Sequence, residues 1–94
     1  MSQEILRIED VFQVAERGTV VTGIREGAWN LAQAGDTIEL ESPDGGSMRN
    51  AIRSLEILRK GVFSGPPFPG VVVLMETVAS DKLPRGSRIL RVSS

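Results

Sequence analysis

The chain has 94 residues, 40% hydrophobic and 24% charged, which supports one packed domain and leaves no room for a second core. With 11 Lys and Arg against 12 Asp and Glu, the formal net charge is -1, and no overall field attracts the protein to nucleic acid or an acidic membrane. The absence of Cys, His and Tyr excludes disulfides, Cys/His zinc sites and His-dependent nucleophilic catalysis. We therefore expect one domain over residues 1–94, with an ordered core of about 5–92, that is not an enzyme and uses neither cofactor nor metal.

The N-terminal segment shows no basic stretch followed by a long apolar run, and the longest unbroken apolar run covers residues 71–75. A membrane-spanning helix needs about 20 apolar residues. We expect a cytoplasmic protein without an export signal and without a membrane partner.

The first half of the chain predicts three strands. Residues 6–14 alternate with a break near Asp10 and Val11, and this alternation gives Phe12 the parity of the core. Residues 19–25 are rich in β-branched side chains, and Gly23 among them marks a bulge or a close backbone approach. Turns at residues 17–18, 26–27, 34–36 and 42–46 separate these segments from each other and from an alternating strand over residues 37–41.

The second half contains a conflict of periods. Residues 47–61 place apolar side chains at helical spacing, which by itself predicts a helix. The proline-rich segment 65–70 predicts a stiff loop that cannot be a central strand, because proline lacks an amide donor. Residues 71–75 predict a strand that is buried on both faces or lines the wall of a barrel, followed by a turn at 83–86 and a last strand over 87–93. Strands at even spacing indicate an all-β fold, a small closed antiparallel β-barrel.

In this order the segments resemble the second domain of elongation factor Tu and related translational GTPases. The resemblance rests on IEDVF (8–12), RGTVVTG (17–23), AGD (34–36), LEILRK (55–60) and LPRGSRIL (83–90), and it covers about nine tenths of the chain. It implies a barrel of the translation-factor type in which residues 48–57 form a strand, so it overrules the helical spacing. The phosphate loop and guanine-binding segments of the GTPase domain do not occur in the sequence, so we expect no nucleotide binding.

The resemblance also implies a function, because this domain helps to hold the 3′ end of aminoacyl-tRNA in the family. Glu56 and Arg59 occupy the matching positions, and Arg53 lies near them. A carboxylate can accept hydrogen bonds from ribose hydroxyls, and a guanidinium can bind phosphate or stack on a base. The expected partners are accordingly tRNA, the ribosome or a translation factor. The alternative is that both charges lie on a solvated edge of the barrel.

Three departures from the family pattern indicate an altered tRNA site. Leu58 replaces a side chain that is often aromatic or His, residues 66–71 lack the family's Asn, and the segment after residue 24 is longer and carries Trp29. Trp29, Phe63 and Phe68 could form a protein interface, or Trp29 could fill the end of the barrel as core.

Arg49, Arg53 and Arg59 share one parity on a strand and could line one face, or serve as ordinary solubilising charge. The second functional hypothesis is therefore a protein-interaction, regulatory or immunity-like barrel without RNA binding. In either case we expect a monomer or a weak homodimer.

Overall fold

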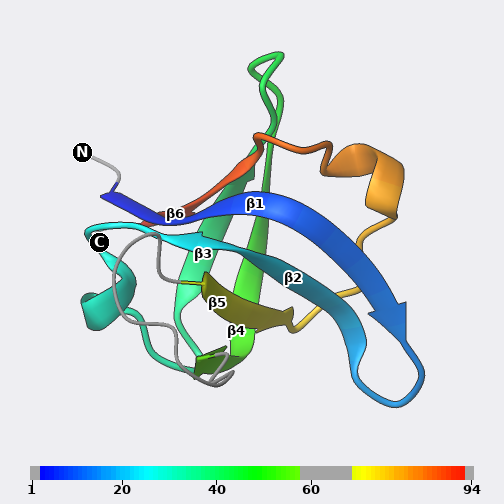
Figure 1. The fold of residues 1–94 in the computed structure, drawn as a ribbon, viewed down its shortest axis with the longest axis horizontal. Helices are drawn as coiled ribbons and strands as arrows, with labels where there is room; N and C mark the ends of the chain where they lie inside the picture. The colour runs from blue at the N-terminus through cyan, green and yellow to red at the C-terminus, as the bar shows by residue number, and fades with distance from the viewer. Residues whose placement is uncertain (1–2, 58–68, 93–94) are drawn as a thin grey trace.

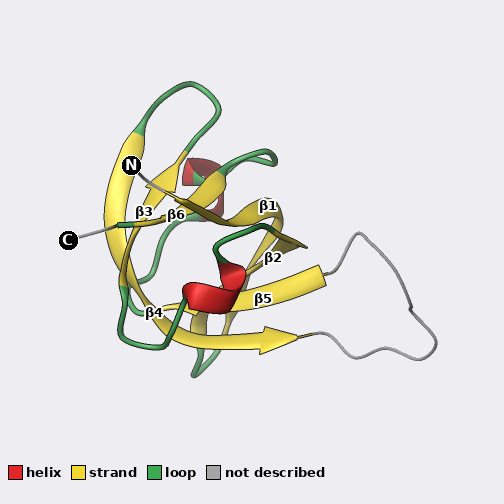
Figure 2. Ribbon diagram, turned by 90° about the vertical axis from the view of Figure 1, so that its left-hand side faces the viewer, coloured by secondary structure: helices red, strands yellow, loops and turns green. Residues whose placement is uncertain are grey.

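The computed structural model describes residues 3–57 and 69–92. Within these ranges one antiparallel sheet closes on itself in the order β1-β2-β5-β4-β3-β6 (Figure 1). The strands are β1 (Gln3–Val14), β2 (Gly18–Arg25), β3 (Thr37–Glu41), β4 (Ser47–Ile57), β5 (Pro69–Leu74) and β6 (Arg88–Arg91). Two short 3-10 turns, η1 (Trp29–Leu31) and η2 (Ser80–Lys82), lie among the connections (Figure 2). The predicted all-β fold and the closed antiparallel barrel are confirmed.

The core fills the inside of the closed sheet. Strand β3 shows the alternation that produces this core, because Ile38 and Leu40 are buried while Thr37, Glu39 and Glu41 are partly or fully exposed. One cluster of buried side chains joins residues of all six strands to Trp29, Val78 and Leu83 from the connections. A second, smaller cluster consists of Val20, Val71 and Val73. This second cluster lies on the outer face of the sheet, since it alternates along β2 and β5 with Val21 and Val72 of the main core.

A bulge in β1 decides where Phe12 lies. The pairing of β1 with β2 shifts register between Ile8 and Asp10, close to the break expected at Asp10 and Val11. An extra residue in one strand exchanges the two faces beyond it. Val11 consequently packs against the core, whereas Phe12 is 51% exposed. The prediction that Phe12 belongs to the core is therefore wrong.

Residues 47–57 form strand β4, which confirms the strand implied by the family resemblance and not the helix predicted by the spacing of apolar residues. Its pairing with β5 shifts register between Ile52 and Ser54. Because of this bulge, Met48, Ile52 and Leu55 all pack on the core although they are spaced by four and three residues. That spacing is also the spacing of one helix face, so a bulged strand produced the helical pattern.

Strand β5 starts inside the segment that was predicted to be a loop. Pro69 and Gly70 pair with Ile24 and Gly23 of β2, so the exclusion of a central strand is wrong for these two residues. Proline is tolerated because Pro69 is the first residue of the strand. Residues 71–74 are buried, as expected, but Met75 follows the strand and is 53% exposed.

The predicted turns are confirmed, and all but the turn at 26–27 place a glycine in the left-handed region of backbone conformation. These glycines are Gly18, Gly35, Gly45 and Gly86, with φ between 89° and 96°. In the part of the chain that the structure describes, no helix is long and apolar enough to cross a membrane.

Candidate functional site

Two residues that the sequence assigns to RNA binding lie together on the outer face of the barrel. The guanidinium of Arg17, at the β1–β2 turn, forms an ion pair and hydrogen bond with the Glu56 carboxylate on β4. The Arg53 guanidinium donates a hydrogen bond of 3.4 Å to the backbone carbonyl of Arg17. We call Arg17, Arg53 and Glu56 the turn cluster. Arg59, the third predicted RNA-binding residue, lies outside the described residues.

The turn cluster is held by local backbone geometry. The turn from β1 to β2 places Glu16 at φ 73° and Gly18 at φ 89°, and the Arg17 amide donates to the Val14 carbonyl at 3.1 Å. On β4, Arg53 occupies the bulge between Ile52 and Ser54. Arg17 was not predicted as a site residue from the sequence, although it begins the RGTVVTG segment. The strand order β2-β5-β4 brings Arg17 to Glu56.

The β4 part of the turn cluster pairs with an apolar part of the outer face. Glu56 pairs with Val71 and Ser54 with Val73, and both valines belong to the outer apolar cluster. The Arg17 and Glu56 side chains are each about half exposed, at 49% and 47%. Their ion pair is therefore accessible to solvent and weakly held.

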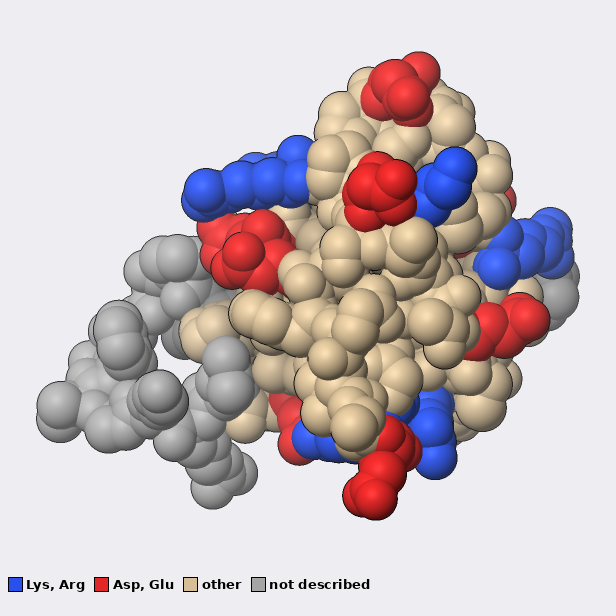
Figure 3. Space-filling model, turned by 90° about the vertical axis from the view of Figure 1, so that its right-hand side faces the viewer, with Lys and Arg blue, Asp and Glu red and all other residues tan. Residues whose placement is uncertain are grey.

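Exposed apolar side chains adjoin the turn cluster. Phe12 pairs with Val20 of the outer apolar cluster, and Val14 pairs with Gly18 beside Arg17. Phe12 and Val14 are both exposed, as is Met75 just beyond the end of β5. Figure 3 shows on one face that charges of both signs surround a broad uncharged area, so no single-sign patch dominates that view.

The predicted protein interface around Trp29 is described only at that residue, because Phe63 and Phe68 lie outside the described residues. Trp29 is 8% exposed and belongs to the main core, which agrees with the core alternative. Its ring lies on Gly70, where an added Cβ would come within 2.8 Å of the ring atom Cη2. The Arg25 guanidinium lies 5.9 Å from the ring centroid, a cation–π distance.

The proposed face of three arginines is only partly described. Arg49 and Arg53 are both exposed residues of β4. They lie in different surroundings, because Arg49 is opposite Glu39 of β3 while Arg53 reaches the β1–β2 turn. The described part of the chain thus brings Arg53, but not Arg49, to the turn cluster.

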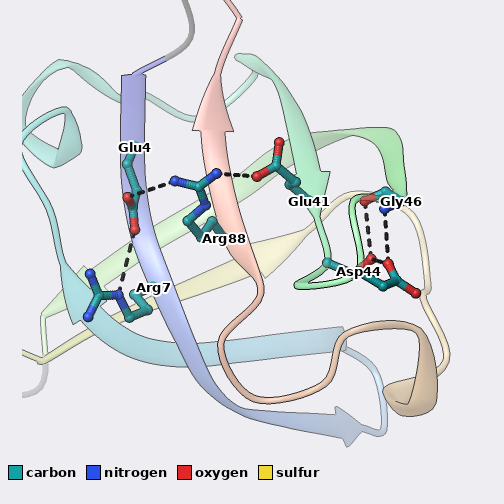
Figure 4. A network of polar contacts seen from close by, with 7 residues as sticks. Glu4, Arg7, Glu41, Asp44, Gly46 and Arg88 are labelled. Atoms are coloured by element: carbon teal, nitrogen blue, oxygen red, sulfur yellow. Dashed lines mark hydrogen bonds and ion pairs between the residues drawn. The ribbon is translucent and has the colours of Figure 1, made fainter.

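A chain of ion pairs crosses the outer face of β1, β6 and β3 (Figure 4). Arg88 binds Glu41, and its other terminal nitrogen lies 3.5 Å from Glu4. Glu4 in turn lies 3.9 Å from Arg7. The hydrogen bond and charge of Glu41 raise the pKa of the Arg88 guanidinium, which keeps it charged. These contacts link three neighbouring strands, so we interpret them as structural.

A search of protein-family models finds no match for this chain. Among residues 3–57 and 69–92, no group of three or more acidic side chains is arranged to hold a metal ion.

Proposed function

We propose that this chain is a non-enzymatic binding module of the translation-factor type that contacts RNA, either a tRNA 3′ end or the ribosome. The observation that carries the proposal is the turn cluster, in which Arg53 and Glu56 both contact Arg17 on the outer face of a closed six-stranded barrel. The sequence resemblance to the second domain of elongation factor Tu supplies the class of partner.

The chemistry of the turn cluster suits a weak RNA contact. Replacing the exposed Arg17–Glu56 pair by an RNA contact costs little, because such pairs contribute less than about 1 kcal/mol. A phosphate could then take the Arg17 guanidinium, and a ribose hydroxyl could donate to the released Glu56 carboxylate. Arg53 would add a second guanidinium beside them. With a net charge of -1, affinity must come from these few contacts.

Titration of a fluorescently labelled single-stranded RNA ending in CCA, repeated at several salt concentrations, tests the proposal. Each lost arginine–phosphate contact should lower the slope of log affinity against log salt by about one. We expect that loss for Arg17→Gln and Arg53→Gln and an unchanged slope for Arg85→Gln. Arg85 is a suitable control because it is exposed on the turn at 83–86 and pairs with Glu9 instead. An equal decrease of the salt slope in all three variants would contradict the proposal, because it would show that the binding is nonspecific and depends only on total charge.

A second candidate function is protein binding through the apolar residues beside the turn cluster. The observation that favours it is that Phe12, Val14 and Met75 are all exposed. Apolar side chains with charged neighbours are typical of small protein interfaces. Binding that is insensitive to salt, survives nuclease treatment and is lost in Phe12→Ser would favour this function over RNA binding.

A further inference from the structure

A polar cavity of about 370 Å³ lies at the start of β3, away from the turn cluster. It is lined by Gly35, Asp36, Thr37, Arg49, Arg91 and Val92. None of the three turn-cluster residues lines it, so its properties are independent of the function proposed above. Cavities of this size are in the range that small ligands occupy.

The strand order brings the two arginines to this cavity from opposite sides. In the closed sheet β3 lies between β4 and β6. Arg49 of β4 pairs with Glu39 of β3, and Arg91 of β6 pairs with Ile38, the preceding residue of β3. Arg49 thus shares the outer face of the sheet with Glu39, whereas Arg91 shares the face of buried Ile38, so the two residues reach the start of β3 from opposite faces of the sheet.

These two arginines differ from the others in the described ranges. Each of the others has a contact: Arg7, Arg17, Arg85 and Arg88 form ion pairs, Arg53 donates to a carbonyl and Arg25 lies over Trp29. For Arg49 and Arg91, no side-chain hydrogen bond or ion pair with a described residue is found. Within the described residues, the only two arginines without a side-chain hydrogen bond, ion pair or ring contact thus line the same cavity.

The nearby carboxylates do not neutralise this pair directly. Asp36 accepts a hydrogen bond of 2.9 Å from the Gln33 amide and so is part of the turn that precedes β3. Glu39 is opposite Arg49 in the register, yet the two described side chains form no ion pair. Thr37 adds a hydroxyl at the cavity that can donate a hydrogen bond.

We infer that this cavity binds a phosphate group, either as inorganic phosphate or as the monoester of a small polar molecule. Two guanidiniums on opposite sides can each donate two hydrogen bonds to a tetrahedral anion, and the Thr37 hydroxyl can donate another. A carboxylate ligand has only two oxygens and can be satisfied by one guanidinium. Charge-assisted hydrogen bonds are stronger than neutral ones, so loss of one arginine has a measurable effect.

A titration of the ¹⁵N-labelled wild-type protein with inorganic phosphate, at ionic strength held constant with chloride, tests the inference without any variant. We expect saturable shifts of the amides of residues 35–37, 49 and 91–92. Shifts that never saturate, or that spread over the barrel without preference for these residues, would overturn it. A titration with sulfate at the same concentration is the control for charge, and shifts of the same amides that saturate more weakly than with phosphate would support the inference.

Three variants make the assignment specific. Arg49→Gln and Arg91→Gln should each weaken phosphate binding about tenfold or more, whereas Arg85→Gln should leave it unchanged. Each variant must retain the wild-type spectrum elsewhere, and Arg91→Lys, which keeps the charge but loses the planar fork, should show an intermediate affinity. If Arg85→Gln weakens binding as much as the cavity variants, the inference is wrong.

The same titration with glycerol 3-phosphate separates the two sources of the group. Tighter binding of the ester, with the same loss in Arg49→Gln and Arg91→Gln, identifies a phosphate monoester. Binding no tighter than that of inorganic phosphate identifies the free anion. Absence of saturable binding by both probes would contradict the inference.

Discussion

Gly23 of β2 lies directly against the backbone carbonyl of Arg7 on β1, so that a Cβ built on Gly23 would be 1.9 Å from that oxygen. This contact is next to the β1 bulge, since Gly23 pairs with Ile8 at the point where the register shifts. Glycine is needed here because no side chain fits between the two backbones. A bulge or a close backbone approach was predicted at Gly23 from the sequence, and the close approach is confirmed.

Gly23→Ala should therefore destabilise the barrel by about 3 kcal/mol or more, because the Cβ would meet backbone rather than a movable side chain. The measurement is the free energy of unfolding in urea. Gly27→Ala is the matched control, since nothing lies within 4 Å of its Cβ position. It should change stability by less than about 1 kcal/mol, and similar losses in the two variants would contradict the role of the contact.

Trp29 should emit at blue-shifted wavelengths and resist quenching by iodide, because it is 8% exposed and belongs to the core. Gly70→Ala should shift the emission to the red and destabilise the protein, since the added Cβ would press on the Trp29 ring. A wild-type emission near that of free indole in water would show that the ring is solvated. The interface interpretation of Trp29 would then regain support.

The Arg17–Glu56 ion pair should contribute little to stability. Arg17→Gln and Glu56→Gln should each lower the free energy of unfolding by less than about 1 kcal/mol, because both side chains are about half exposed. A double-mutant cycle in urea measures the coupling, which should fall further in high salt. A coupling of several kcal/mol would make the pair a structural element and would weaken the proposal that RNA displaces it.

The bulges explain where sequence reasoning succeeded and where it failed. Turns and β-branched strands depend on local residue chemistry, so the closed all-β fold could be predicted. A bulge depends on pairing with a distant strand, and one extra residue exchanges the faces of a strand. For this reason Phe12 was assigned to the wrong face of β1. The bulge in β4 likewise gave Met48, Ile52 and Leu55 the spacing of one helix face.

The sites depend still more on strand order. Glu56 and Arg53 were singled out through a sequence resemblance, but their neighbour Arg17 is 36 residues from Arg53 in the sequence. Arg49 and Arg91 meet at one cavity only because β3 lies between β4 and β6. No local pattern encodes that order, so the convergence of these arginines could not be predicted from the sequence.

The turn between β3 and β4 should make the stability of the barrel depend on pH in the acid range. Asp44 accepts hydrogen bonds from the Ser42 hydroxyl and, at 3.0 Å, from the Gly46 amide, as Figure 4 shows for Gly46. The hydrogen bond from Ser42, followed by that from Gly46, lowers the pKa of the Asp44 carboxyl below its ordinary value of 3.8. Both bonds favour the ionised form in the folded state.

Because the folded pKa of Asp44 lies below the unfolded pKa, its ionised carboxylate stabilises the fold at pH values above 3.8. That stabilisation is lost as the pH falls from 3.8 through the lower folded pKa. Asp44→Asn should thus be less stable than wild type at neutral pH, with a difference that shrinks steadily on acidification. Urea unfolding across the acid range measures the difference, and Ser42→Ala should show the same trend with a smaller amplitude. The ion pairs elsewhere in the barrel are the same in wild type and in both variants, so their effects cancel in the comparison. A stability difference between wild type and Asp44→Asn that does not change with pH would contradict the prediction, because it would show that Asp44 titrates alike in the folded and unfolded states.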